Sequence, residues 1–245
     1  MTSELTSTRK LRPVSVDDGV VATGRLVSDG GSTRLDAVAY GLYDQFIRGA
    51  GGISVATDLP SGLASDDLVT VQGFWTGESI RNARVVDFVA PISMPVRLGD
   101  GIDPAIVPAG RLARNEILAP TVLGLTQELS DETLLFYCAH KMTDGWFGIA
   151  CVTDSGPLEQ ALRPILGDAL AVVEVDWTPH DLRLTDDFVE EYDFADGLLT
   201  FGKFVHPAGQ FTSYALVRII TPEMASTLSP VDPRAIILTD WIQKT

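Results

Sequence analysis

The chain has 245 residues, of which 33 are Asp or Glu and 18 are Lys or Arg, so its formal net charge at pH 7 is −15. This acidity excludes a protein that binds nucleic acid or anionic lipid over its whole surface, because phosphate binding needs surplus Lys and Arg. With 45% hydrophobic and 21% charged residues the chain is globular, and its two cysteines are too few for a disulfide scaffold.

The N-terminal segment carries a short basic cluster, Arg9, Lys10 and Arg12, with no apolar run behind it. A secretory signal needs an apolar core of about 7–15 residues, and a membrane-spanning helix needs about 18 or more apolar residues. No window of the sequence has either property. We therefore predict a cytoplasmic protein that has no membrane partner.

The acidic excess is concentrated in the second part of the chain. Residues 1–100 hold 9 basic and 12 acidic side chains, a balance of −3, whereas residues 101–245 hold 9 and 21, a balance of −12. The change falls beside the segment 91–104, which is spaced with Pro and Gly and is typical of a linker. The predicted organisation is an N-terminal arm at 1–13, a first domain at 14–95, a connecting segment at 96–120 and an acidic β-rich domain at 121–245.

Short strands around one helix are expected in the first domain. A β-run at 19–27 is followed by the turn Ser28-Asp-Gly-Gly-Ser32 and a second β-run at 33–40, which is the pattern of a hairpin. Further along the chain, the pattern predicts a helix at 42–48 and strands at 53–57, 67–75 and 80–89. The domain should therefore be mainly β.

This order of elements, ending in DLVTVQGFW (67–75) and IRNARVVDFV (80–89), resembles the oligonucleotide/oligosaccharide-binding (OB) fold. That fold is a five-stranded Greek-key barrel with a helix between its third and fourth strands. The resemblance covers about residues 14–92, is one of pattern, and implies single-stranded nucleic-acid binding through cations and aromatic faces. The residues expected to bind are Arg25, Arg34, Trp75, Arg81 and Arg84, with Tyr40 and Phe74 as further aromatic faces.

The second domain is expected to mix strands with short helices. The predicted helices span 109–118 and 157–166, the second one shortened or kinked by Pro164. The predicted strands span 133–142, 146–153, 169–177, 198–205 and 211–221. Segment 196–205 also echoes 66–75, which fits either a second, related barrel or two unrelated hairpins, and the sequence leaves both alternatives open.

A hairpin centred on Asp144-Gly145 is expected to bring the two cysteines together. Folding the chain at this type I′ turn signal places Cys138 opposite Cys151 and His140 opposite Ile149, on a core-facing side of the sheet. The main interpretation is two reduced thiols packed as small hydrophobes, and the alternative is a cross-strand disulfide or redox switch.

No motif predicts a catalytic, cofactor or metal site. The three histidines, His140, His180 and His206, match no metal-ligand spacing. Segment 197–203 has the Gly and Lys spacing of a phosphate-binding loop, but Phe204 stands where a Ser or Thr is required. We therefore predict no cofactor, while a small-ligand enzyme with its site in a barrel mouth stays a third alternative.

The densest acidic stretch spans residues 181–196 and interleaves acids with aromatic side chains. It is expected to be a short exposed helix or a loop, either solvated with its aromatics in the chain's own core or presenting an apolar anchor in an acidic rim. The predicted partner-binding residues are Asp186, Asp187, Phe188, Glu190, Glu191 and Tyr192. The leading hypothesis is a non-catalytic interaction or assembly module for a basic protein partner, and the alternative is a single-stranded nucleic-acid-binding protein.

Overall fold

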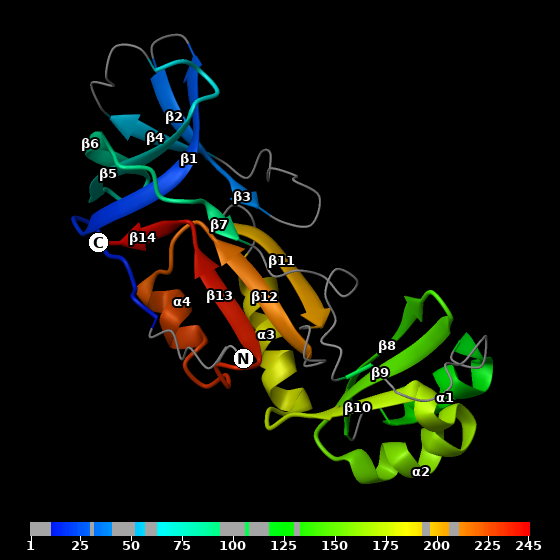
Figure 1. The fold of residues 1–245 in the computed structure, drawn as a ribbon. Coiled ribbons are helices and arrows are strands. Elements are labelled where there is room, and N and C mark those ends of the chain that lie inside the picture. Colours follow the sequence, from blue (N-terminus) through cyan, green and yellow to red (C-terminus); the bar gives the residue numbers. More distant parts are fainter. Residues whose placement is uncertain are drawn as a thin grey trace.

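The computed structural model describes residues 11–29, 32–40, 52–56, 63–93, 106–107, 118–129, 133–192, 197–205 and 211–245. The helix expected at 42–48, nearly all of the one expected at 109–118, and His206 lie outside these residues. Strands predominate in the described part, which confirms the expected mainly β fold class (Figure 1). None of the described helices is long and apolar enough to cross a membrane.

Five strands close into a barrel-like ring in the first part of the chain, and all five match expected strands. They are β1 (Gly19–Asp29), β2 (Ser32–Ala37), β4 (Ile53–Ala56), β5 (Leu68–Trp75) and β6 (Ser79–Val86). The ring order is β1-β2-β4-β6-β5, and pairing of β5 with β1 closes it. Only β4 and β6 run parallel within the ring. The short strands β3 (Ala39–Tyr40) and β7 (Ile92–Ser93) form a separate parallel pair.

The interior of the ring is filled by alternate side chains of each strand, as a sheet with one buried face requires. On β5, for example, Val69, Val71 and Trp75 point inward and are buried, whereas Gln72 and Phe74 point outward. Residues outside the ring, among them Leu216 and Trp241, belong to the same apolar cluster. The ring therefore shares its core with the C-terminal part of the chain.

The last strand, β14 (Ile242–Lys244), returns to the ring and pairs with the beginning of β1. Val20 lies opposite Lys244 and Ala22 opposite Ile242 in an antiparallel register. The C-terminal residues thus join the first sheet, although the predicted domain boundary at 96–120 assigns them to the second domain (Figure 1).

A three-stranded sheet adjoins the ring and has two buried faces. It contains β11 (Leu198–Val205) and β12 (Phe211–Val217), which are antiparallel, and β13 (Ile236–Asp240), which runs parallel to β12. Tyr214 and Leu216 pack in the core of the ring, whereas Ala215 and Val217 pack in a second cluster with helices α3 (Pro179–Glu191) and α4 (Pro222–Thr227). Among the described residues these strands form an open sheet, so the echo between 66–75 and 196–205 does not reflect a second closed ring.

A separate lobe contains the remaining elements and lies at the far end of the molecule from the ring (Figure 1). Its sheet has the order β10 (Leu170–Glu174), β9 (Gly145–Val152), β8 (Leu134–Met142). Helices α1 (Pro120–Leu129) and α2 (Ser155–Leu166) cover one face, which buries residues such as Ala150 and Val152. The opposite face, with Phe147, Ile149 and Cys151, contributes to the second cluster.

The β8–β9 hairpin forms where expected, but its register differs from the predicted one. Met142 lies opposite Gly145, so the turn is Thr143-Asp144, and Cys138 lies opposite Ile149 instead of Cys151. Moving the turn by one residue moves every cross-strand pair by two, which keeps each side chain on its predicted face. The prediction of paired cysteines is therefore wrong, whereas Cys138 and Cys151 do share the core-facing side. His140 lies opposite Phe147, not Ile149.

Candidate interaction surfaces

Two of the arginines expected to bind nucleic acid are already paired with carboxylates. Arg25 on β1 lies 3.5 Å from the carboxylate of Asp66, and the Nε of Arg34 on β2 lies 2.7 Å from that of Asp36. Both arginines point outward from the ring. Their charges are compensated locally, which weakens the positive groove that single-strand binding requires.

The two arginines of β6 also lie on the outer face of the ring. Arg81 donates to the carboxylate of Asp17 at 2.6 Å, and Arg84 donates to the neutral amide oxygen of Gln72 at 3.1 Å. A register irregularity in β6, with Asn82 at a φ of 49°, lets both side chains point outward although they are three residues apart. Arg25 and Arg34 thus lie on the neighbouring strands β1 and β2, Arg81 and Arg84 lie on β6, and three of the four are paired with carboxylates.

Trp75 does not offer a stacking face. Its side chain points into the ring and is only 5% exposed, whereas its neighbour Phe74 points outward and is 45% exposed. The prediction of Trp75 as an aromatic platform is wrong because side chains alternate along a strand. The sequence did indicate that Trp75 is buried. Val69, Val71 and Trp75 are separated by even numbers of residues, so they lie on the same face of the strand, and the two valines mark that face as the core face.

Residues 181–191 of the acidic stretch belong to a helix, α3, fixed at its N-terminus by a capping box. Thr178 accepts from the amide of Asp181, and the Asp181 carboxylate accepts from the amide of Thr178 at 2.8 Å, with Pro179 in the first turn. Asp181 also accepts from the amide of Asp232. His180 lies in the first turn of this helix.

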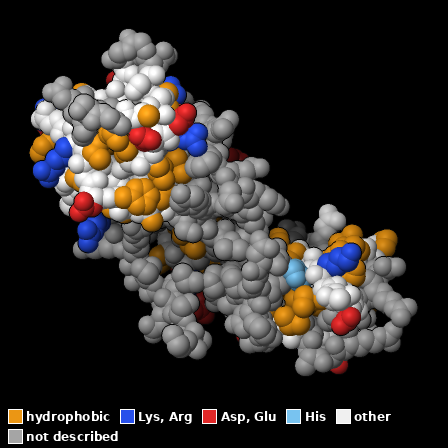
Figure 2. All heavy atoms as spheres, turned by 45° about the horizontal axis from the view of Figure 1, so that its top comes forward, with side chains coloured by type: hydrophobic (Ala, Val, Ile, Leu, Met, Phe, Trp, Pro, Cys, Tyr) orange, Lys and Arg blue, Asp and Glu red, His pale blue; other side chains and the backbone are white. Residues whose placement is uncertain are grey.

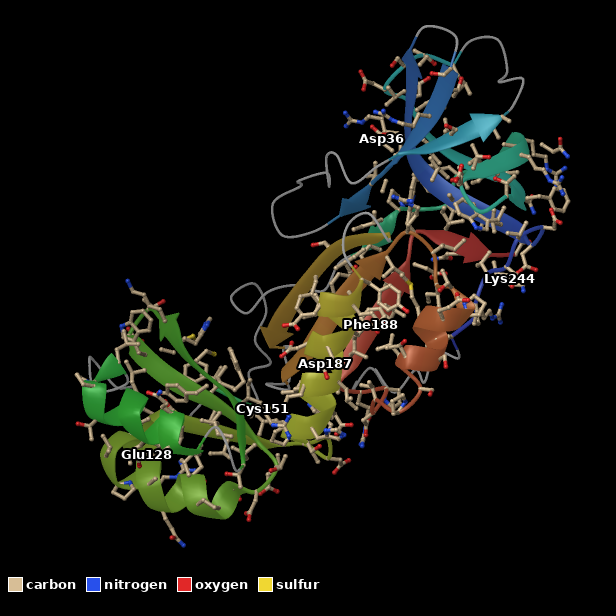
Figure 3. The ribbon with its side chains drawn as sticks, turned by 180° about the vertical axis from the view of Figure 1, so that it is seen from behind. Asp36, Glu128, Cys151, Asp187, Phe188 and Lys244 are labelled. Carbon is tan, nitrogen blue, oxygen red and sulfur yellow. The ribbon has the colours of Figure 1, made fainter. Side chains whose placement is uncertain are left out.

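Phe188 is fully buried in the second cluster and does not serve as an exposed anchor. The ring of Tyr192 packs against it with 4.9 Å between centroids, and the hydroxyls of Tyr192 and Thr227 lie 3.5 Å apart. Phe188 and Tyr192 thus agree with the alternative in which the aromatics of the acidic stretch belong to the chain's own core. Figure 3 shows Phe188 and Asp187 next to each other on α3.

The carboxylates of α3 accumulate in its last two turns. Asp187, Glu190 and Glu191 are exposed, and Asp186 is half-buried with an interaction of its own. Asp187 and Glu191 are like-charged neighbours at i and i+4, and the last turn contains no basic residue. Both the mutual repulsion and the negative end of the helix dipole disfavour acids at this position. Within the described part of the chain, no salt bridge involves the three exposed acids.

Arg234 connects the segment before α3 with the segment before β13. It forms ion pairs with Asp176 and Asp232, and its guanidinium lies 5.8 Å from the centre of the Trp177 ring. Its hydrogen bond lowers the pKa of the Asp232 carboxyl below the usual value. This cluster holds the N-terminus of α3 against the C-terminal sheet.

The thiol and imidazole groups of the lobe are packed in apolar surroundings. Neither Cys138 nor Cys151 forms a disulfide in the described chain, and burial raises the pKa of the Cys138 thiol to about 11. The His140 ring contacts Phe147 edge to face at 5.3 Å, and burial lowers the pKa of this imidazole. Across the described ranges, no group of three or more His, Cys, Asp or Glu side chains is arranged to hold a metal ion.

An open groove of about 630 Å³ lies at one end of the ring, lined by Gly52, Ser54 and the turn Thr76–Ser79. Thr76 organises this turn, because its hydroxyl accepts from the amide of Ser79 at 3.0 Å. The lining offers hydroxyls, backbone and the carboxylate of Glu78, which suits polar contacts more than acid–base chemistry.

No protein-family model, curated protein or solved structure matches this chain. Function therefore has to be inferred from two surfaces. One is the exposed acidic end of α3, and the other is the outer face of the ring around Phe74.

Proposed function

We propose that the protein is a non-catalytic interaction module that binds a basic protein partner on the exposed carboxylates of α3, namely Asp187, Glu190 and Glu191. The observation that carries this proposal is their position. Three exposed acids occupy the end of a helix that favours positive charge. Phe188 and Tyr192 lie beneath them and pack in the core, so the acids are presented from a rigid element.

The cost of this arrangement can be relieved by cations from outside the chain. Each like-charge pair at i and i+4 costs roughly 0.2–0.5 kcal/mol, and acids in the last turn cost about 0.3–1 kcal/mol against the helix dipole. A Lys or Arg of a partner would remove both terms at once. The net charge of −15 would also raise the association rate with a basic partner at low ionic strength.

The test is affinity capture with the full chain as bait, from cells that express it naturally. The triple variant Asp187→Asn, Glu190→Gln, Glu191→Gln is expected to lose a partner that the wild-type chain retains, and the wild-type complex is expected to weaken with added salt. A matched control removes three dispersed exposed acids, by Glu128→Gln, Asp144→Asn and Glu223→Gln. Equal loss in both triple variants would mean that net charge matters and α3 does not.

We also propose that the ring is OB-like. It has five strands, the pairing of β1 with β5 closes it, and its third and fifth strands in chain order, β4 and β6, pair in parallel. This likeness supports the alternative function, single-stranded nucleic-acid binding. Its other support is that Arg84, whose hydrogen-bond partner Gln72 is neutral, lies near the exposed Phe74. Failure of a labelled oligothymidylate to bind the chain at low salt would remove this alternative, since electrostatic affinity is greatest there.

A further inference from the structure

An apolar surface on the outside of the ring has no partner in the described chain. It consists of Val16, Phe74, Phe88 and Val89, which are between 45% and 59% exposed, and we refer to these four residues as the ring patch. Figure 2 shows hydrophobic side chains gathered on a face of the ring, with acidic and basic side chains at their margin. Large apolar side chains grouped in this way on a surface mark interaction sites more often than chance exposure does.

Hydrogen bonds place the ring patch along the outer face of β5. At one end, the amide of Asp17 donates to the carbonyl of Trp75 at 2.8 Å, which holds Val16 beside the β5–β6 turn and Phe74. At the other end, the amide of Val89 donates to the hydroxyl of Thr70 at 2.9 Å. Thr70 and Phe74 lie on the same side of β5, four residues or roughly 13 Å apart. The patch therefore has two ends, Val16 with Phe74 and Phe88 with Val89, and the outward-pointing Gln72 of β5 lies between them.

Most of the charged side chains around this patch balance one another. Asp17 and Arg81 lie at the Phe74 end, where they form an exposed ion pair, and Arg84 and Asp87 lie toward the Phe88 end on β6 and just after it. The border of the patch thus includes two positive and two negative charges, together with the exposed carboxylate of Glu78 in the β5–β6 turn beside Val16, on a chain whose net charge is −15. Elsewhere on the surface two copies of such a chain repel each other, whereas the charges near this patch nearly balance.

We propose that the ring patch is the interface of a symmetric dimer of this chain. In a two-fold interface the same surface of each copy contacts that of the other. The Phe74 end of the patch in one copy then faces the Phe88 end in the second copy. This places Arg81 of each copy against Asp87 of the other and packs Phe74 against Phe88. A nucleic-acid strand fits the patch less well, because Asp17 compensates Arg81 and two of the four apolar residues are aliphatic.

The first test measures the mass of the full chain in solution by light scattering or sedimentation, from low micromolar to several hundred micromolar concentration. The wild type is expected to shift from monomer to dimer, and Phe74→Ser with Phe88→Ser is expected to weaken dimerisation by at least about tenfold. The matched control, Leu123→Ser with Ile165→Ser, changes two exposed apolar residues of the lobe and should leave the dimer intact. A wild-type monomer at every concentration, or equal weakening in the control, overturns the proposal.

The second test exchanges charges across the proposed interface. Arg81→Asp or Asp87→Arg alone places like charges opposite each other twice per dimer, and each is expected to weaken dimerisation by about tenfold. The double variant restores opposite charges and is expected to recover most of the wild-type affinity. Because all of these side chains are exposed, unchanged thermal midpoints will show that the fold is retained. No recovery in the double variant contradicts the two-fold arrangement.

Salt dependence separates the dimer from a nucleic-acid complex on the same surface. Added NaCl screens the repulsion between two chains of charge −15, so moderate salt should strengthen the dimer, whereas it weakens a complex with an oligonucleotide. Binding of labelled oligothymidylate that is abolished by Phe74→Ser, with no dimer detected, would assign the patch to nucleic acid instead. This proposal does not involve α3, so its failure leaves the proposed acidic docking surface unaffected.

Discussion

The indole N–H of Trp241 donates to the main-chain carbonyl of Thr23 at 2.7 Å, across 218 residues of sequence. The bond lies in the shared core between the ring and the three-stranded sheet, where Trp241 is 3% exposed. It fixes the end of the chain against β1 immediately before β14 joins the same strand. The two ends of the described chain are therefore joined by this buried contact, by the pairing of β14 with β1 and by an ion pair between Lys244 and Asp18.

We expect Trp241→Phe to lower the free energy of unfolding by about 1–3 kcal/mol, because it leaves the buried carbonyl of Thr23 unpaired. Trp241→Ala should cost about 3–5 kcal/mol, since it also removes the packed ring. Urea unfolding measures both. Trp146→Phe, at a half-buried indole on the lobe, is the control and should cost less. Equal losses of unfolding free energy in Trp241→Phe and Trp146→Phe would show that the Trp241–Thr23 hydrogen bond does not stabilise the fold.

Two glycines are expected to respond to alanine in opposite directions. A Cβ at Gly24 would meet the carbonyl of Asp36 and the side chain of Leu35, whereas at Gly124 in α1 it would meet nothing within 4 Å. Gly24→Ala should therefore destabilise the chain by about 1–3 kcal/mol, and Gly124→Ala should stabilise it by up to about 1 kcal/mol. The comparison of thermal midpoints decides this, and a stable Gly24→Ala variant would show that β1 and β2 are further apart.

The Cys138 thiol is expected to be nearly unreactive in the native chain. Its pKa of about 11, raised by burial, leaves only about one thiol in several thousand ionised at pH 7.5. Alkylation by iodoacetamide should thus be slow, should accelerate roughly tenfold per pH unit below that pKa, and should become rapid in denaturant. Peptide mass spectrometry identifies the modified cysteine. Rapid native labelling, or a Cys138–Cys151 disulfide under mild oxidation, would be inconsistent with the observed register.

Acid is expected to weaken the cluster around Arg234. The hydrogen bond from Arg234 lowers the pKa of Asp232 in the folded chain, so its contribution is complete above the unfolded value of about 3.9 and is lost as pH falls through the lower folded value. Arg234→Gln should therefore make the unfolding free energy less dependent on pH below about 4. Arg183→Gln, at an exposed arginine of α3, is the control. If the unfolding free energies of the wild type and Arg234→Gln changed in parallel with pH, Arg234 would not stabilise the ionised Asp232 carboxylate.

Local patterns in the sequence predicted most strands well. The strands at 19–27, 67–75 and 198–205 were recognisable because β-branched and apolar residues form short runs bounded by Gly-rich or polar turns. Helix α2 was recognisable from Gly167, which follows it and has a φ of 53°, although the helix begins at Ser155, two residues before the predicted start. Helix α3 was left ambiguous with a loop, although the Thr178-Pro-His-Asp181 capping box was present in the sequence.

The candidate sites were less predictable than the strands. Whether a side chain is exposed depends on which face of its strand or helix it occupies and on packing against distant parts of the chain. The sequence identified the charged residues of α3, but not that Phe188 is buried against the C-terminal sheet. It also identified the aromatic pair Phe74-Trp75, but the choice of Trp75 reversed the two faces of β5. The apolar residues Phe88 and Val89 carry no local signal of exposure, since it depends on where the chain runs after β6.

The sequence by itself determined the acidic charge and its concentration after residue 100, because a charge count does not depend on folding. It also determined the positions of most strands, since periodicity and turn residues act over a few neighbours. Only the tertiary structure decided which carboxylates compensate Arg25, Arg34 and Arg81, and that β14 completes the first sheet. Except for the pair Arg34–Asp36, those contacts join residues far apart in the chain, and their free energy is gained only when a particular packing brings them together.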